Sequence, residues 1–395
     1  MKKTVAIIGG GASALLAAAF LDPDKFDVTI YEKNKALGRK FLVAGQGGFN
    51  LTHSEPIDAM ITRYKPDDLL KKALLDFTND DLRNWLLETG IPTITGSSKR
   101  VYPEEGIKPV TVFNKIMARL ENQNVKIAYN HTWEGWNTNN ELLFNDDMKI
   151  KADLVIFSLG GASYKVTGSD GTWIGIFEKK GINTLPFLSS NCAYQIDWPK
   201  ELIEKTEGAP LKNISLTCSG KTQKGELVIT KFGLEGNAIY ALSSEIQSGL
   251  TEKNTATIYL DLKPDLASDE LQAIITRSTL KTTEILKQKL NLSQAKIHLL
   301  KSSLTKAQFL DHTILAGKIK SLPLTVLAAA PLDEAISTTG GVSLEEVNED
   351  FELHKLKNTF CIGEMLDWNA PTGGYLLQAC FSMGVFVARH LNKVS

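Results

Sequence analysis

Near the amino terminus, the residues that could do chemistry are a set of glycines followed by one acid. Gly9, Gly11 and Ala14 fit the spacing G-x-G-x-x-G/A, and Glu32 lies 21 residues after Gly11. The first glycine allows a tight turn, the second lets a pyrophosphate approach the backbone, and the third position must be small so that a helix can pack on a strand. An acid at this distance accepts hydrogen bonds from a ribose 2′-hydroxyl. The pattern predicts a dinucleotide site that favours adenosine without a 2′-phosphate.

A second glycine-rich stretch favours FAD over NAD as that dinucleotide. Four glycines between residues 38 and 48 allow the backbone to pass close to a bulky flat ligand. Arg39 and Lys40 could offset the charge of its phosphates. The alternative is a flexible surface loop with solvated charges. This half of the chain contributes the expected FAD-binding residues Gly9, Gly11, Ser13, Ala14, Glu32, Lys33, Arg39, Lys40, Gly47 and Asn50.

The last seventy residues repeat the order strand, glycine turn, helix. A strand over Asn358 to Ile362 ends in Gly363-Glu364, and Gly373-Gly374-Tyr375 opens an apolar helix that runs to about Leu391. The amino terminus of such a helix could face the flavin ring and stabilise its anionic reduced form. The second half contributes the expected FAD-binding residues Gly160, Gly363, Glu364, Asp367, Gly373, Gly374 and Tyr375.

Three side chains are candidates for catalysis. His53 closes the glycine-rich loop, where an imidazole could shuttle a proton beside the flavin; the alternative is a loop histidine bonded to backbone. Arg100 and Tyr102 could bind a substrate carboxylate or simply pack. The four cysteines form no CxxC pair, and neither a Ser-His-Asp triad nor a metal site is indicated.

The elements that must position these residues follow from the apolar pattern. Strands are expected over Thr4 to Ile8, Asp27 to Tyr31 and Asp153 to Phe157, with a helix from Leu15 to Leu21. Val125 to Trp136 and Glu141 to Ile150 are expected to pair as short antiparallel strands. From about Leu188 four strand-like runs suggest a small antiparallel sheet or barrel, and Ser268 to Gly317 is expected to be helical and rich in lysine.

Composition sets limits on the function. The chain has 395 residues, 43% of them hydrophobic, and 44 Lys and Arg against 45 Asp and Glu give a net charge of −1. Such a balance argues against nucleic acid or an anionic membrane as the main partner. Apolar runs are too short for a transmembrane helix, and the scattered cysteines are typical of a reducing cytoplasm. We expect a cytoplasmic protein.

The motifs in order resemble those of the bacterial BaiN-type, aminoacetone-oxidase-like FAD flavoproteins. The resemblance runs through nearly the whole chain and is carried by Gly9-x-Gly11-x-x-Ala14, Gly38-Arg39-Lys40-Phe41-Leu42, Asn50-Leu51-Thr52-His53, Arg100-Val101-Tyr102-Pro103, Gly225-Glu226-Leu227, Thr230-x-Phe232-Gly233-x-x-Gly236, Gly340-Gly341-Val342, Gly363-Glu364-x-x-Asp367 and Gly373-Gly374-Tyr375-x-x-Gln378. The chain departs from relatives that carry Gly-Gly-Gly-Arg-Cys-Asn at 45–50 and Gly-Gly-Tyr-Asn at 373–376. It therefore resembles a distinct branch, in which cofactor binding carries over and substrate identity does not.

The resemblance implies an α/β fold of the two-dinucleotide-binding-domain flavoproteins. A discontinuous Rossmann-type FAD-binding domain (1–188 and 323–395) would carry an inserted antiparallel β-barrel-like domain (189–263) and a small helical subdomain (264–322). This division agrees with the change of pattern near Leu188 and the return near Pro323.

The sequence predicts an FAD-dependent oxidoreductase whose small-molecule substrate meets the flavin at the domain interface. NAD(P)H stays open as an electron donor, although no second G-x-G-x-x-G follows a strand and so no dedicated second nucleotide domain is evident. Two alternatives remain. One is a flavin-dependent RNA-modifying or nucleic-acid-associated flavoprotein, for which a lysine-rich segment (Lys281, Lys287, Lys289, Lys296, Lys301 and Lys306) counts mildly. The other is a non-catalytic flavin redox sensor.

Overall fold

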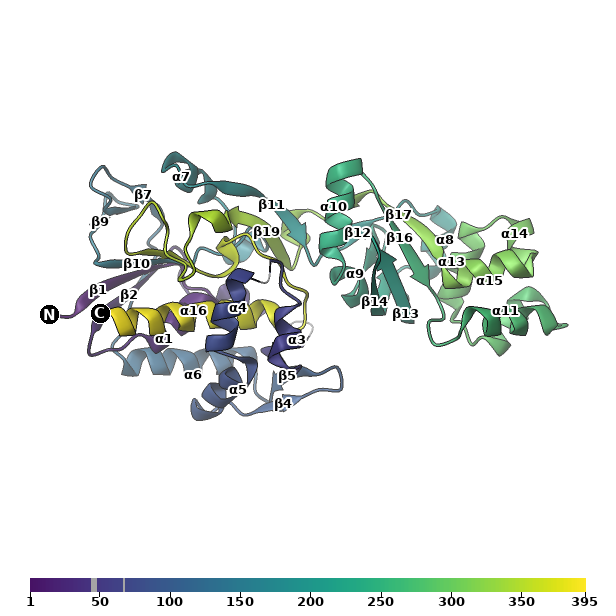
Figure 1. The fold of residues 1–395 in the computed structure, drawn as a ribbon, viewed down its shortest axis with the longest axis horizontal. Helices are drawn as coiled ribbons and strands as arrows, with labels where there is room; N and C mark the ends of the chain where they lie inside the picture. Colours follow the sequence, from purple (N-terminus) through teal and green to yellow (C-terminus); the bar gives the residue numbers. More distant parts are fainter. Residues whose placement is uncertain (44–47, 67) are drawn as a thin grey trace. The chain divides into compact units, whose positions relative to one another are not determined.

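A computed structural model describes residues 1–43, 48–66 and 68–395. The chain divides into two compact units, of which the first combines Met1–Leu188 with Ile336–Ser395 and the second is Ser189–Ala335. Each unit has its own hydrophobic core. The sections at both ends of the chain therefore fold together, and Figure 1 shows the two termini in the same unit.

A five-stranded parallel sheet forms the centre of the first unit. Its order is β20 (Thr359–Cys361), β10 (Leu154–Phe157), β1 (Lys3–Ile8), β2 (Phe26–Glu32) and β6 (Lys126–Tyr129). All four pairings are parallel. Strands β1 and β10 are mostly apolar and buried, as expected of strands covered on both faces.

Two helices that begin at glycine turns pack on each other beside this sheet. They are α1 (Ala12–Phe20) and α16 (Tyr375–Val394). A Cβ added at Gly384 of α16 would collide with the backbone of Ser13 in α1, so the missing side chain lets the two backbones approach. The glycine turns that open both helices are thereby placed in one unit (Figure 1).

The remaining elements of the first unit surround this centre. An antiparallel sheet joins β3 (Thr52–His53), β5 (Arg100–Pro103) and β4 (Thr93–Thr95). The other elements are α2 (Arg39–Val43), α3 (Ile57–Ile61), α4 (Asp68–Asp76), α5 (Asn79–Glu88), α6 (Pro109–Asn122), β7 (Trp133–Trp136), β8 (Leu142–Phe144), β9 (Lys149–Ile150), α7 (Ile174–Lys179), and the strand pair β11 (Thr184–Ser190) and β19 (Ser337–Val342).

One expectation about this unit was wrong. We expected Val125 to Trp136 to pair antiparallel with the strand that follows, but β6 pairs in parallel with β2 and extends the central sheet. Only β7 turns back to pair antiparallel with β8. The reason is physical: α6 crosses over between β2 and β6, and a helical crossover returns the chain in the parallel direction.

A seven-stranded antiparallel sheet forms the second unit. Its order is β17 (Leu322–Val326), β16 (Ala256–Asp261), β13 (Pro210–Cys218), β14 (Lys221–Ile229), β15 (Gly233–Glu235), β12 (Tyr194–Gln195) and β18 (Ala328–Ala329). Its helices are α8 (Lys200–Thr206), α9 (Asn237–Tyr240), α10 (Ser243–Lys253), α11 (Ser268–Arg277), α12 (Thr282–Glu284), α13 (Gln294–Ser303), α14 (Lys306–Leu310) and α15 (His312–Lys320), with a π-helical turn at Ile285–Lys289.

The expected domain boundaries stay a prediction, and the structure differs from them in one respect. We assigned residues from 323 onward to the FAD-binding domain. In the structure β17 pairs antiparallel with β16, so residues up to Ala335 belong to the second unit. A short apolar strand gives no local sign of the sheet it joins, because its pairing partner lies about 65 residues away in the chain.

Among the helices that the structure describes, none combines the length and apolar composition needed to cross a bilayer.

Candidate functional site

The turn between β1 and α1 has the geometry of a phosphate cradle. Gly9 has φ = +95°, and a Cβ added there would collide with the carbonyl oxygen of Ser158. A Cβ added at Gly11 would meet nothing within 4 Å, so this residue borders open space. Gly11 is also the N-cap of α1 and provides no capping side chain, which leaves the first N–H groups of the helix available to a ligand. Ala14 is fully buried, as helix–strand packing requires.

Glu32 lies at the end of β2, beside this cradle. Its Oε2 accepts a hydrogen bond from the Gly10 N–H (2.9 Å), and its Oε1 accepts two from Asn34, from the backbone N–H (2.8 Å) and from Nδ2 (2.7 Å). A carboxylate can accept about four hydrogen bonds. Glu32 therefore shapes the turn and keeps acceptor capacity for a ribose hydroxyl.

The three expected basic residues all have protein partners. Lys33 forms an ion pair with Asp170 (2.8 Å), and Lys40 Nζ donates to both Glu364 (2.7 Å) and the Ser163 hydroxyl (2.8 Å). Arg39 donates only to neutral acceptors, the side chain of Asn34 (2.6 Å) and the carbonyl of Val166 (2.7 Å). Among these three side chains, Arg39 is the one whose charge has no carboxylate partner in the described residues.

The residues expected from the second half of the chain reach the same turn. A Cβ added at Gly363 would lie 2.5 Å from the Ser13 hydroxyl, and that hydroxyl is buried and bonded to Ser158 (2.7 Å). The Lys40–Glu364 ion pair makes a second link between the two ends of the chain. The structure thus brings Gly363 and Glu364 of the second set to Ser13 and Lys40 of the first.

Three expected residues contribute through backbone or local bonds. Asp367 accepts from the Gly340 N–H (2.7 Å), and the Gly160 carbonyl accepts from the Trp173 indole (3.1 Å). Asn50 donates to the Gly48 carbonyl (3.2 Å). Gly47 lies outside the described residues.

The start of α16 is fixed by its neighbours. Gly373 and Gly374 have φ of +113° and +101°, and a Cβ at Gly374 would collide with the backbone of Thr52. The carbonyl of Tyr375 accepts from the buried Tyr64 hydroxyl (2.9 Å). The backbone of Thr52 and the side chain of Tyr64 therefore hold the first turn of this helix in place.

A buried carboxylate that sequence reasoning missed completes this attachment. Glu55 accepts two hydrogen bonds from Arg63 (3.2 Å from Nε, 2.9 Å from Nη2) and one from the Tyr375 hydroxyl (2.6 Å). Burial acts to raise the pKa of Glu55, but the bonds from Arg63 and Tyr375 outweigh it and lower the pKa, so Glu55 is ionised at neutral pH. No local motif marks Glu55, because its partners lie 8 and 320 residues away.

The imidazole ring of His53 is hydrogen-bonded to backbone groups. Its Nδ1 accepts from the Glu55 N–H (3.2 Å), its ring has a backbone hydrogen bond with Ser98, and it stacks on Tyr375 with centroids 5.0 Å apart. Burial lowers its pKa, more than the nearby Glu55 raises it, so the ring is neutral at pH 7. These bonds favour the loop-histidine interpretation of His53 over a proton shuttle.

Arg100 and Tyr102 lie on one face of β5. Val101 and Pro103 are buried, whereas the two candidates alternate with them and are partly exposed. In the ladder His53 lies opposite Arg100, which places both on the same face. In the part of the chain that the structure describes, the guanidinium of Arg100 has neither a hydrogen bond nor an ion pair.

Comparisons with known proteins agree with this geometry. A sequence-family model described as HI0933-like protein Rossmann domain matches residues 3–390. The chain is 26% identical to a 3-dehydro-bile acid delta(4,6)-reductase of Clostridium scindens, with 98% of each chain covered. It is 23% identical to a ribosomal RNA dihydrouridine synthase of Haemophilus influenzae (98% of each) and 22% identical to one of Escherichia coli (98% of this chain, 97% of the other).

Among solved structures, the open conformation of a flavocytochrome c3 fumarate reductase has a similar fold. The TM-score is 0.51 at 12% identity, with 99% of this chain and 78% of the other covered. At this identity the likeness concerns the fold alone.

Proposed function

Because the chain belongs to the HI0933-like Rossmann family of FAD-dependent oxidoreductases, we propose that it reduces a carbon–carbon double bond conjugated to a carbonyl group. The substrate class we favour is a small unsaturated carbonyl compound. The expectations of FAD as cofactor, of an oxidoreductase and of the family itself are confirmed. The identity of the substrate is part of the proposal.

One observation carries the choice of reaction. A delta(4,6)-reductase of a 3-dehydro-bile acid acts, by its name, on double bonds that can conjugate with the 3-oxo group. Dihydrouridine is uridine whose ring double bond, conjugated to a ring carbonyl, has been reduced, and two relatives are named as its synthases. The named products differ greatly in size, yet the bond reduced is of one chemical kind. We propose that this protein reduces a double bond of the same kind.

The residues around the start of α1 fit FAD. We propose that the open space beside Gly11 takes the pyrophosphate and that Glu32 accepts from the ribose. Lys33, Arg39, Lys40 and Glu364 would border the cofactor, and Gly373 to Tyr375 would face the flavin. Bound FAD, once reduced, supplies a hydride. The protein contributes by holding the cofactor and by keeping the fixed first turn of α16 oriented.

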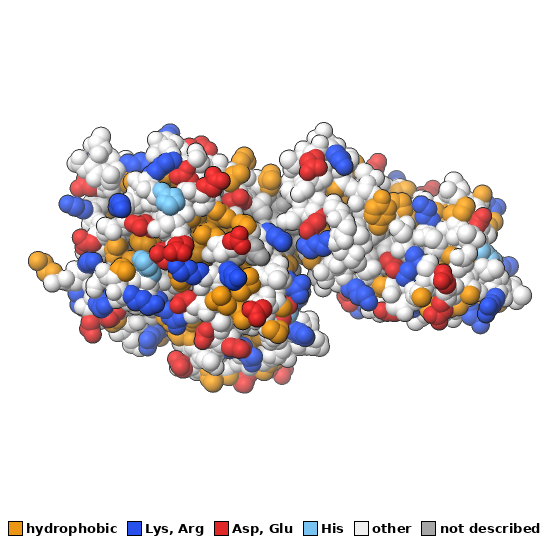
Figure 2. Space-filling view, viewed as in Figure 1, with side chains coloured by type: hydrophobic (Ala, Val, Ile, Leu, Met, Phe, Trp, Pro, Cys, Tyr) orange, Lys and Arg blue, Asp and Glu red, His pale blue; other side chains and the backbone are white. Residues whose placement is uncertain are grey.

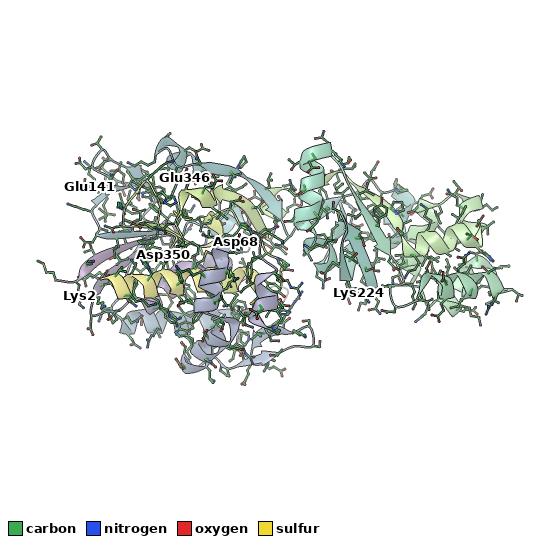
Figure 3. All side chains as sticks on the ribbon, in the orientation of Figure 1. Lys2, Asp68, Glu141, Lys224, Glu346 and Asp350 are labelled. Atoms are coloured by element: carbon green, nitrogen blue, oxygen red, sulfur yellow. The ribbon has the colours of Figure 1, made fainter. Side chains whose placement is uncertain are left out.

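Charge favours a small substrate over RNA. Figure 2 shows acidic and basic side chains interspersed on the visible face of each unit rather than gathered by sign. Of the six lysines between residues 281 and 306, five are exposed, but Lys296 is buried and bonded to backbone, so it cannot meet a phosphate. Lys224 on β14, labelled in Figure 3, is one of the other exposed lysines of the second unit.

RNA remains the second candidate because two relatives are named ribosomal RNA dihydrouridine synthases. A gel-shift assay with ribosomal RNA at several salt concentrations tests it. Tight binding that weakens steeply with salt would favour the RNA substrate, since phosphate contacts release counterions. Weak binding at all salt concentrations supports the small-molecule proposal.

Product analysis tests the proposed reaction. The FAD-loaded protein is reduced with dithionite without oxygen, freed of excess reductant and mixed with a conjugated cyclic ketone, its saturated counterpart or a uridine oligonucleotide. We expect mass spectrometry to show that the conjugated ketone gains two hydrogen atoms, in an amount equal to the FAD reoxidised. The absence of product in every arm would contradict the proposal and favour a redox sensor.

A further inference from the structure

Arg100 is the candidate whose charged side chain has no partner among the described residues. The sheet of β3, β5 and β4 buries Val101 and Pro103 on one face and presents His53, Arg100 and Tyr102 on the other. His53 is already bonded to backbone through its ring. The face therefore offers a guanidinium and a phenol to whatever lies beside it.

Of the two arginines near this face, Arg63 is paired with a carboxylate and Arg100 is not. Arg63 is neutralised by Glu55 through two hydrogen bonds, and Glu55 accepts a third from the Tyr375 hydroxyl. The described residues give the guanidinium of Arg100 no hydrogen-bond acceptor, although this group has five N–H donors. Both arginines help to lower the pKa of His53, after the larger effect of burial, whereas the Glu55 carboxylate raises it.

Glycines lie beside these two partly exposed side chains. A Cβ added at Gly373 would lie 3.2 Å from the Arg100 Nε, so the guanidinium rests against the turn that opens α16. The Tyr102 ring lies between Gly48 and Gly96, with distances of 3.3 and 3.1 Å to Cβ atoms added there. The missing side chains of these three glycines make the room that the Arg100 guanidinium and the Tyr102 ring occupy, so backbone on three segments fixes where both groups lie.

We propose that Arg100 is a catalytic residue that binds the carbonyl oxygen of the substrate, with the Tyr102 ring beside it. This inference rests on the proposed function. A hydride from reduced FAD would form a C–H bond at the β-carbon, and the electron pair of the double bond would move through the α-carbon to the oxygen. The guanidinium would stabilise the resulting enolate, which then takes a proton from water at the α-carbon to give the saturated ketone.

A ligand that mimics the enolate tests this role without turnover. A para-substituted phenol carries an anionic oxygen on a flat ring when ionised, and its binding beside oxidised FAD is followed by the change in the flavin absorbance. We expect Arg100→Gln to weaken phenol binding roughly tenfold to hundredfold, the effect of losing a hydrogen bond between charged groups. We expect Arg100→Lys to recover part of the loss, and the FAD content to stay as in the native protein.

The matched control is Lys99→Gln, which removes an exposed positive charge from the adjacent residue. It should leave phenol binding within about twofold of native, since exposed charges are screened. Native-like phenol binding by Arg100→Gln, or none by the native protein, would overturn the role of Arg100. A loss of bound FAD in Arg100→Gln would also overturn it, because Arg100 would then hold the cofactor rather than the substrate. The product assay above decides the proposed reaction separately, since it uses the native protein alone.

Discussion

At the scale of single residues, the two glycines of the turn between β1 and α1 have different roles: one is needed for the fold and the other for the cofactor. Gly9 is required by the fold, because its positive φ and the nearby Ser158 carbonyl leave no room for a side chain. Gly11 borders open space, so the fold itself tolerates a methyl group there. The two glycines of one motif therefore have different reasons to be glycine.

A pair of alanine substitutions checks this distinction. We expect Gly11→Ala to leave the thermal unfolding of the FAD-free protein unchanged and to weaken FAD binding, because the methyl group enters the pyrophosphate space. Gly9→Ala should lower the unfolding temperature of the FAD-free protein. Differential scanning fluorimetry and FAD titration measure both effects. Equal loss of stability in the two variants would contradict the assignment of the cradle.

Glu32 carries a second prediction at this scale. Glu32→Ala should weaken FAD binding roughly tenfold to hundredfold, the effect of losing a hydrogen bond to a charged group. The structure adds a loss of stability, because the Gly10 N–H and the Asn34 side chain would lose their acceptor. Asp27→Asn, at an exposed acid of the same strand, is the control for FAD titration. Unchanged affinity in Glu32→Ala would mean that the carboxylate does not reach the ribose.

At the scale of elements, a buried lysine attaches α13 to the β-sheet of the second unit. Lys296 Nζ donates to the carbonyls of Leu262 (2.6 Å) and Asn213 (3.1 Å). Burial lowers its pKa from 10.5 to about 8. Between these pH values the unfolded chain keeps a proton that the folded chain has lost, so rising pH favours the folded state through this group.

This linkage gives a pH prediction with a definite sign. We expect the free energy of unfolding of the native protein, minus that of Lys296→Met, to increase from pH 8 to pH 10. Urea unfolding followed by circular dichroism at several pH values measures the difference. The subtraction removes the titration of cysteines and tyrosines common to both proteins. A difference that stays constant or falls with pH would show that Lys296 keeps its proton.

Elements also show why sequence predicted only part of the site. The glycine turns before α1 and α16 were predicted because each motif is local, with strand, turn and helix adjacent in the chain. The parallel pairing of β6 was missed because the pattern of a short apolar run does not show whether the strand pairs in parallel or antiparallel. Glu55 was missed because its role depends on Tyr375, 320 residues away.

At the scale of the whole molecule, the arrangement of the chain bears on the electron donor. Residues 189–335 form an antiparallel sheet with helices, and its described pairings are all antiparallel. A parallel strand–helix–strand unit of the kind that binds a second dinucleotide is absent from the described residues of this unit. The resemblance to the BaiN-type flavoproteins implied that the two ends of the chain belong to one domain, and in the structure both ends lie in one compact unit.

We therefore predict that NADH and NADPH reduce the bound FAD slowly, if at all. Stopped-flow mixing without oxygen, followed by the flavin absorbance, measures the rate at several nicotinamide concentrations. Saturable reduction at rates on the order of 1–1,000 per second would contradict the prediction, since such rates are typical of turnover. Reduction of the same protein by dithionite is the control for FAD that can accept electrons.

The most direct test of the central claim is the reoxidation of reduced FAD in this protein by a conjugated ketone without oxygen. We predict that the flavin absorbance returns at a rate that saturates with the concentration of the conjugated ketone. The saturated counterpart, which has no double bond to accept the hydride, should leave the FAD reduced. Reoxidation at the same rate by both compounds, or by neither across a panel of ring sizes, would contradict the account.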